Sequence, residues 1–169
     1  IPLSFGIATT ILVGQTLGQK EIERAKFISY HAIFTCCSIS IVMAIIILLL
    51  KDLIPLAFTS DPTSIAIAAA LLVFAAIYQI PDALQVVCNG ILRGYKHTKP
   101  TLFITIFCYW MVGMPLGYVL SRTNWLVEPM AAAGFWLVFC ICLTLAAGLL
   151  FYQMRKIPAL PDQTQLQRL

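Results

Sequence analysis

The sequence predicts an all-α integral membrane protein, a polytopic helix bundle with five transmembrane helices. Hydrophobic residues make up 60% of the 169 residues and charged residues only 11%, and the mean hydropathy is +0.91. Soluble domains are about half apolar and about one quarter charged. The apolar stretches are also long enough to cross a bilayer, which takes about 20 residues at a rise of about 1.5 Å each. Nearly all charged residues lie between these stretches.

Five segments meet or approach this length, namely residues 1–17, 27–50, 65–92, 101–120 and 129–154. The connections between them are alternately rich and poor in basic residues. Under the positive-inside rule, the first and third connections and the tail 157–169 face the cytoplasm. The first span then begins outside, which requires an odd number of earlier spans. Because the sequence also starts with Ile1 in place of methionine, we expect it to be the C-terminal part of a longer chain.

The first two segments differ in the surroundings that they predict. Segment 1–17 is rich in small and hydroxyl residues, among them Gly6, Thr9, Thr10 and Gly14. Such residues let helix backbones approach closely in lipid, so this helix is expected to pack inside the bundle. The second segment is nearly all aliphatic over residues 39–50, which predicts a helix that faces lipid over much of its surface.

The third segment carries an acid inside its apolar run. Counted back from Arg93 at the next basic connection, Asp82 lies about 16 Å deep, near the middle of the hydrocarbon. Acids at this depth are usually functional. The alternative is a salt bridge to a basic residue on a helix outside this sequence, because none of the five spans offers a central Lys or Arg.

Other oxygen ligands accompany this acid. The proline before Asp82 has no N–H to donate to the Ile77 carbonyl, which loses its helical partner. At about 100° per residue, Tyr78, Gln85 and Asn89 lie within about 60° of one another on the same face as the acid. Carboxylate, phenol, amide and carbonyl oxygens suit Na+ or a proton-carrying carboxyl. We therefore predict a cation site of Asp82, Tyr78 and the Ile77 carbonyl, with Asp82 as the Na+ ligand and Gln85 and Asn89 continuing the polar stripe.

The fourth segment combines aromatic residues with Gly113 and Pro115 in mid-span. A helix interrupted by Gly and Pro beside a proline-bearing helix is typical of transporters, in which broken helices build a site at the midplane. The fifth segment ends in the basic pair Arg155 and Lys156. All six cysteines lie within apolar runs and are interpreted as small buried residues.

Several function classes do not fit this pattern. The basic residues lie at helix ends and form no basic-aromatic face for nucleic acid. No Ser/His, HExxH or paired-carboxylate set appears within the spans, so we expect neither an enzyme nor a cofactor. A flippase of lipid intermediates would need several basic residues inside the spans to meet pyrophosphate. It and a non-transporting structural membrane subunit stay open as alternatives to transport.

Specific stretches resemble the multidrug and toxic compound extrusion (MATE) family, in its bacterial, NorM-like branch. Asn89-Gly-Ile-Leu-Arg-Gly-Tyr-Lys-His-Thr-Lys-Pro100, with Tyr78-Gln-Ile-Pro-Asp82 before it, is similar to that family's tenth helix and following loop. Residues 2–18 resemble the eighth helix, and residues 110–117 and 128–136 the eleventh and twelfth. The resemblance implies twelve helices in two lobes, of which residues 1–156 form most of the C-terminal lobe. Seven helices would precede Ile1.

The resemblance also implies a function and a setting. The expected activity is antiport of Na+ or H+ against cationic or amphiphilic drugs, with no cofactor. Asp82 and Tyr78 map onto the family's cation site in the C-terminal lobe, whose acidic partner is on the seventh helix, outside this sequence. The expected partners are the lipid bilayer, small-molecule drugs and the N-terminal lobe. The expected location is the bacterial cytoplasmic (inner) membrane, multi-pass, with a cytoplasmic C-terminus.

Overall fold

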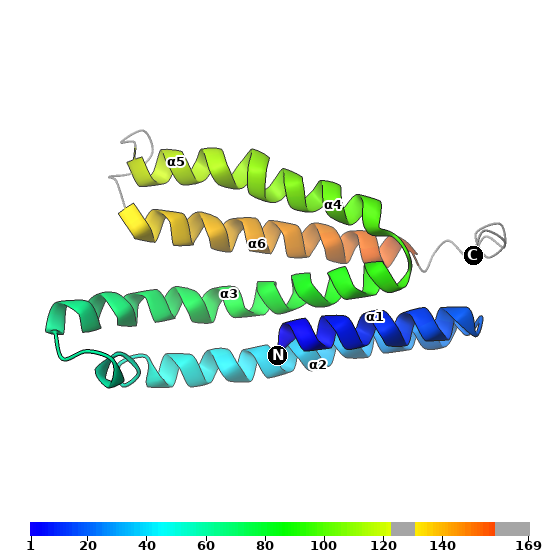
Figure 1. Ribbon diagram of the computed structural model, residues 1–169, viewed down its shortest axis with the longest axis horizontal. Helices are drawn as coiled ribbons and strands as arrows, with labels where there is room; N and C mark the ends of the chain where they lie inside the picture. Colours follow the sequence, from blue (N-terminus) through cyan, green and yellow to red (C-terminus); the bar gives the residue numbers. More distant parts are fainter. Residues whose placement is uncertain (123–130, 158–169) are drawn as a thin grey trace.

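The computed structural model describes residues 1–122 and 131–157, and all regular structure in these ranges is helical. The elements are α1 (Pro2–Gly18), α2 (Ile22–Leu50), the 3₁₀ turn η1 (Pro55–Ala57), α3 (Pro62–Gly94), α4 (Thr98–Ile106), the π-helix η2 (Phe107–Gly113), α5 (Met114–Arg122) and α6 (Ala131–Lys156). Since α4, η2 and α5 are continuous, the described residues form five rods (Figure 1). The predicted all-helical membrane fold is confirmed.

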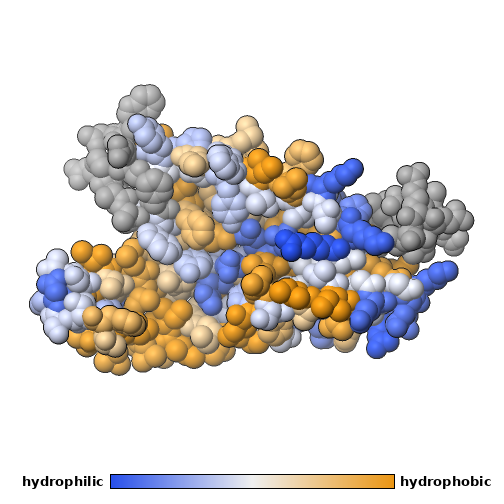
Figure 2. All heavy atoms as spheres, in the orientation of Figure 1, coloured by the Kyte–Doolittle hydropathy of each residue, from blue (hydrophilic) through white to orange (hydrophobic). Residues whose placement is uncertain are grey.

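Four of these rods are long and apolar enough to cross a membrane, and the first, α1, has 17 residues. Figure 2 shows mostly apolar residues along the sides of the half that contains α1 to α3, and strongly hydrophilic residues at the end where α1 and α3 finish. Residues 129–130 of the predicted fifth span and 158–169 of the predicted tail lie outside the described residues.

Helix α3 is the central element of the bundle. It lies between α1 and α2 on one side and α4 to α6 on the other (Figure 1), and its most extensive contacts are with α1, α2 and α6. Asp61 caps its first turn by accepting from the Ser64 backbone N–H at 2.9 Å, and Pro62 occupies the first helical position, as expected for a helix start. The helix runs 33 residues through Pro81 without a break.

The core of the bundle forms around the C-terminal half of α3. Fully buried side chains from α3 pack there with side chains of α2 and α6; they are Cys36, Ala83, Val87, Cys88, Ile91, Leu92, Leu150 and Met154. On α2 the buried positions are small, for example Ser29, Ser40 and Ala44. Its large aliphatic residues are exposed, Leu49 by 75%, as expected of a helix that faces lipid.

Helix α1 packs against the C-terminal half of α3, and the two run in the same direction. At their crossing, a Cβ atom built on Gly90 would lie 2.9 Å from the Cα of Gly6, so the two backbones touch. The Thr10 hydroxyl also donates to the Gly90 carbonyl at 2.9 Å. This contact agrees with the interior packing predicted from the small residues of the first segment. As a result, α1 begins level with the middle of α3 (Figure 1).

The fourth rod is interrupted in mid-span by the seven-residue π-helix η2. The interruption was expected from Gly113 and Pro115, but its form was not. The nitrogen of Pro115 has no N–H for the Met111 carbonyl, and a wider π turn is a known way to absorb a lost helical hydrogen bond. Gly113 lets η2 approach α6, since a Cβ atom there would lie 3.1 Å from the Cys142 sulfur.

Candidate functional site

Asp82 lies near the middle of α3 and is half-buried. Within the described residues its carboxylate has no hydrogen bond and no ion-pair partner. Two groups from other elements are close enough to interact with it electrostatically: the Cys36 thiol of α2 and the Tyr109 hydroxyl of η2. The acid is therefore located where α2 and η2 both approach α3.

Tyr78 lies one turn before Asp82, but its ring belongs to an aromatic cluster shared with α6. It stacks on Trp136 with a centroid distance of 5.8 Å and meets Phe139 edge-on at 5.9 Å. Tyr109 joins the cluster through Phe139, at 6.5 Å. The Tyr78 hydroxyl makes no hydrogen bond within the described part of the chain. It is free to serve as the predicted cation ligand, whereas its ring fixes α3 against α6.

Gln85 is buried, with 8% of its surface exposed, and it accepts a hydrogen bond of 2.9 Å from the Tyr109 hydroxyl. This bond joins α3 to the π-helix in the middle of the fourth rod. Sequence reasoning placed Gln85 on the polar stripe and missed Tyr109, because the two residues are 24 positions apart. The only signal for Tyr109 was its position among the aromatic residues next to Gly113.

The other two predicted residues are placed differently from each other. The side-chain oxygen of Asn89 is buried and has no hydrogen-bond partner within the described residues. The Ile77 side chain is 56% exposed. At about 100° per residue it projects about 140° away from Asp82 around α3, and among the described residues no contact links its carbonyl to the acid.

The arrangement can neutralise a charge. A carboxylate without a partner is costly at the depth of a membrane span, and a proton or a Na+ ion would remove that cost. The Tyr109 hydroxyl, which interacts with Asp82, and the Tyr78 hydroxyl, one turn before it on α3, are neutral oxygen ligands of the kind suited to a hard cation. No cluster of three or more His, Cys, Asp or Glu residues exists among the residues described, so these ranges offer no ligand set of the transition-metal kind.

Apolar rods of membrane length, packed around a helix with an unpaired acid, define a multi-pass membrane protein. The sequence profile of the MatE family matches residues 1–119. The chain therefore belongs to the MatE family.

Curated relatives cover the whole chain. It is 64% identical over 169 residues to the probable multidrug resistance protein NorM of Haemophilus ducreyi, with 100% of this chain and 36% of that protein aligned. It is 41% identical to multidrug resistance protein NorM of Vibrio vulnificus over 98% of the chain and 36% of the relative. It is 40% identical to multidrug resistance protein MdtK of Pectobacterium atrosepticum over 99% of the chain and 37% of the relative. The chain thus spans little more than a third of the length of these relatives.

Two solved structures share the fold. The crystal structure of the eukaryotic MATE transporter AtDTX14 superposes with a TM-score of 0.85 at 21% identity, over 99% of this chain and 36% of that one. An inward-facing multidrug resistance MATE family transporter of the MOP superfamily gives a TM-score of 0.77 at 18% identity, over 91% of this chain and 35% of that one. None of these relatives is named as an enzyme, in agreement with the expectation from the sequence.

Proposed function

We propose that the intact protein is a cation-coupled multidrug antiporter that works by alternating access, with Asp82 as the acid that binds Na+ or H+. One observation carries the proposal. Asp82 is the single acidic residue within the five spans predicted from this sequence. Its carboxylate has no hydrogen bond or ion pair within the described residues. An acid near the middle of a membrane span is costly and is usually retained for function.

Binding of the cation changes the charge at the contact between elements. The Cys36 thiol and the Tyr109 hydroxyl both lie close enough to the Asp82 carboxylate to interact with it, so a bound Na+ or H+ alters their interaction with α3. A ligand shifts a conformational equilibrium only by its difference in affinity for the two states. We infer that the cation and the drug favour different arrangements of these helices, which is what coupling requires.

A different observation supports each residue of the proposed cation site. Tyr109 is added because its hydroxyl interacts with Asp82 and bonds to Gln85. Tyr78 is retained because its hydroxyl is free within the described residues and it lies one turn from the acid. Asn89 continues the site as an acceptor without a partner. The Ile77 carbonyl remains in the proposal on the strength of the following proline alone.

The substrates and the setting are part of the same proposal. Relatives are named multidrug resistance proteins, which supports cationic or amphiphilic drugs as the exported molecules. The positive-inside pattern supports a cytoplasmic C-terminus in the bacterial inner membrane. The rest of the transporter, including the N-terminal lobe, would supply the facing half of the drug pathway. No observation favours the flippase or the structural subunit, and the spans contain no central Lys or Arg to meet a pyrophosphate.

The test is transport by the intact protein in vesicles, with Na+ and pH gradients imposed separately and efflux of a fluorescent cationic dye as the readout. Asp82→Asn removes the charge with little change of shape and should reduce ion-driven efflux to the level of protein-free vesicles. Asp61→Asn is the matched control, because it makes the same chemical change in the cap of the same helix and outside the span. Undiminished efflux in Asp82→Asn would overturn the assignment of the acid, and no ion-driven efflux by the wild type would overturn the function.

A further inference from the structure

Helices α1 and α3 end in the same way. In each, two backbone hydrogen bonds close the last turn: Lys20 N–H to Leu17 and Glu21 N–H to Thr16, both 3.0 Å, on α1. On α3 the equivalent bonds run from Lys96 and His97 and are both 2.9 Å. This is the Schellman motif, in which the residue after the cap adopts the left-handed backbone conformation and is usually glycine.

Both motifs have lysine in the position that favours glycine. Lys20 has φ 64° and Lys96 has φ 58°, and these are the two non-glycine residues with positive φ among those described. A side chain with a Cβ atom is strained in this conformation. The sequences around them also correspond, Gly18-Gln-Lys20 in one and Gly94-Tyr-Lys96 in the other. A strained residue that recurs at two equivalent places indicates a role for its side chain.

The two lysines belong to one basic end of the bundle. Because α1, α3 and α6 all finish at that end (Figure 1), it gathers most of the basic side chains of the sequence. They are Lys20, Arg24, Lys26, Arg93, Lys96, Lys99, Arg155 and Lys156. The acids near them in the described part are Glu21 and Glu23, so this end carries a large excess of positive charge.

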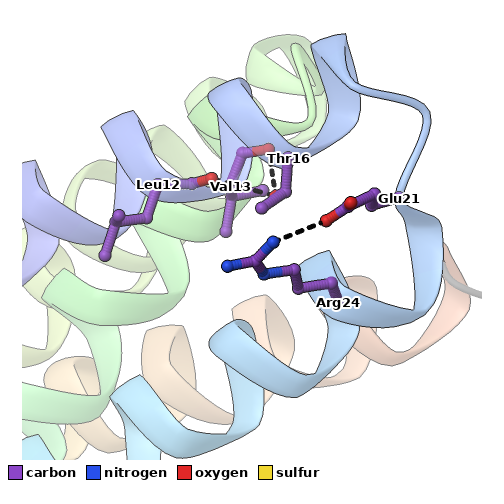
Figure 3. A network of polar contacts seen from close by, with 5 residues as sticks. All are labelled: Leu12, Val13, Thr16, Glu21 and Arg24. Atoms are coloured by element: carbon purple, nitrogen blue, oxygen red, sulfur yellow. Dashed lines mark hydrogen bonds and ion pairs between the residues drawn. The ribbon is translucent and has the colours of Figure 1, made fainter.

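Glu21 and Glu23 both form ion pairs with basic residues of α2. Arg24 pairs with Glu21 at 2.9 Å and Lys26 with Glu23 at 2.7 Å, and Figure 3 shows the Arg24 guanidinium directed toward the Glu21 carboxylate at the corner between α1 and α2. Lys20 and Lys96 are exposed and have no ion pair within the described residues. The helix dipole favours a positive charge at this position, but it acts on a lysine in any backbone conformation and so does not account for the strained one.

We propose that Lys20 and Lys96 bind the phosphate groups of anionic phospholipids at the membrane surface. Both lie just beyond the ends of apolar helices at the same basic end of the bundle, which places them at the level of the headgroups. Topology alone would be served by lysine in any conformation, whereas the Schellman motif fixes the direction of the Cα–Cβ bond of both lysines at the ends of α1 and α3. Clusters of basic residues next to membrane helices recognise anionic lipids. Lipid binding at this end does not depend on the proposed transport.

The test uses the intact protein in mixed micelles, titrated with phosphatidylglycerol or with phosphatidylcholine, and follows the apparent dissociation constant by intrinsic fluorescence and the unfolding temperature. The variant is Lys20→Gly with Lys96→Gly. Glycine suits the left-handed positions better than lysine does, so the unfolding temperature in phosphatidylcholine should be equal or higher, and loss of binding cannot be blamed on misfolding. Lys51→Gln, at the opposite end of the bundle, is the control.

The double variant should bind phosphatidylglycerol about 30-fold more weakly, because each lysine near the surface contributes about fivefold. Lys20→Arg with Lys96→Arg should bind like the wild type, and higher salt should weaken wild-type binding. Unchanged phosphatidylglycerol affinity in the double glycine variant would overturn the proposal. An equal response of the wild type to inorganic phosphate without lipid, or to an RNA oligonucleotide in place of lipid, would also overturn it.

Discussion

Replacing Gly90 with alanine tests the tightest contact in the bundle, the crossing of α1 and α3. The added Cβ atom would lie 2.9 Å from both the Cα and the carbonyl carbon of Gly6 and closer still to the Gly6 carbonyl oxygen. All three are backbone atoms, so no side-chain rotation can make room. The two helices would have to move apart by about 1 Å to restore van der Waals separation.

Three terms set the size of the effect. Overpacking of a well-packed interface costs about 1–3 kcal/mol, and the upper part of that range applies because backbone must move. Separation of the helices also weakens the hydrogen bond from Thr10 to the Gly90 carbonyl, and bonds of this kind between membrane helices contribute about 0.6 kcal/mol. The better helix propensity of alanine returns about 0.5–1 kcal/mol. The net loss should be about 2–3 kcal/mol in the free energy of unfolding.

The assay is unfolding of the intact protein in mixed micelles titrated with a denaturing detergent. Gly14→Ala is the control, because Gly14 is on α1 and a Cβ atom there would have no neighbour within 4 Å. It should leave the free energy of unfolding unchanged or raise it by less than about 1 kcal/mol. If Gly90→Ala is no more destabilising than Gly14→Ala, the α1–α3 crossing is not as close as described.

Two further predictions concern α3. Tyr109→Phe removes the donor to the buried Gln85 oxygen and should lower the free energy of unfolding by about 1 kcal/mol. Tyr78→Phe should leave the free energy of unfolding unchanged. Equal effects of the two variants would contradict the role given to the bond between Tyr109 and Gln85. The Ser64 hydroxyl and backbone N–H both donate to the Asp61 carboxylate, and these bonds hold the pKa of the Asp61 carboxyl below its usual range. The cap therefore stabilises the fold fully above about pH 4, the pKa of the carboxyl in the unfolded chain. The stabilisation is lost as the pH falls through the lower pKa of the folded state. The difference in unfolding midpoint between wild type and Asp61→Ala should therefore shrink below about pH 4, and a constant difference from pH 7 to pH 3 would show that the cap is not ionic.

The helical rods and the importance of α3 were predictable, because both depend on signals that are local in the sequence. The length of an apolar run and the position of a charge within it can be read directly, and so can the small residues that let α1 pack closely. The cap at Asp61 and Pro62 is equally local. What could not be predicted is which residues meet. Nothing in the sequence pairs Gly6 with Gly90, since that contact depends on the direction and height at which α1 lies against α3.

The details of the candidate site were less predictable for the same reason. Helical periodicity placed Tyr78, Gln85 and Asn89 on one face with the acid, but α3 is surrounded by neighbours and this face meets more than one of them. Tyr78 is therefore drawn into the aromatic cluster with Trp136, and Gln85 into a bond with Tyr109. The π-helix that positions Tyr109 is a response to a proline whose effect sequence rules describe only as a kink or break.

The angles around α3 explain why the acid is placed where it is. Gln85 points toward η2 and Gly90 toward α1, and these two directions differ by about 140° at about 100° per residue. Asp82 and Asn89 fall between them, at about 60° and 40° from Gln85. Asp82 and Asn89 therefore face the boundary, called the seam below, between two groups of helices: α1 with α2, and α4 to α6. This placement explains why Asp82 interacts with Cys36 on one side and with Tyr109 on the other. Under the proposed function, a cation at this seam acts on both groups at once, whereas an acid directed at either group alone would act on one.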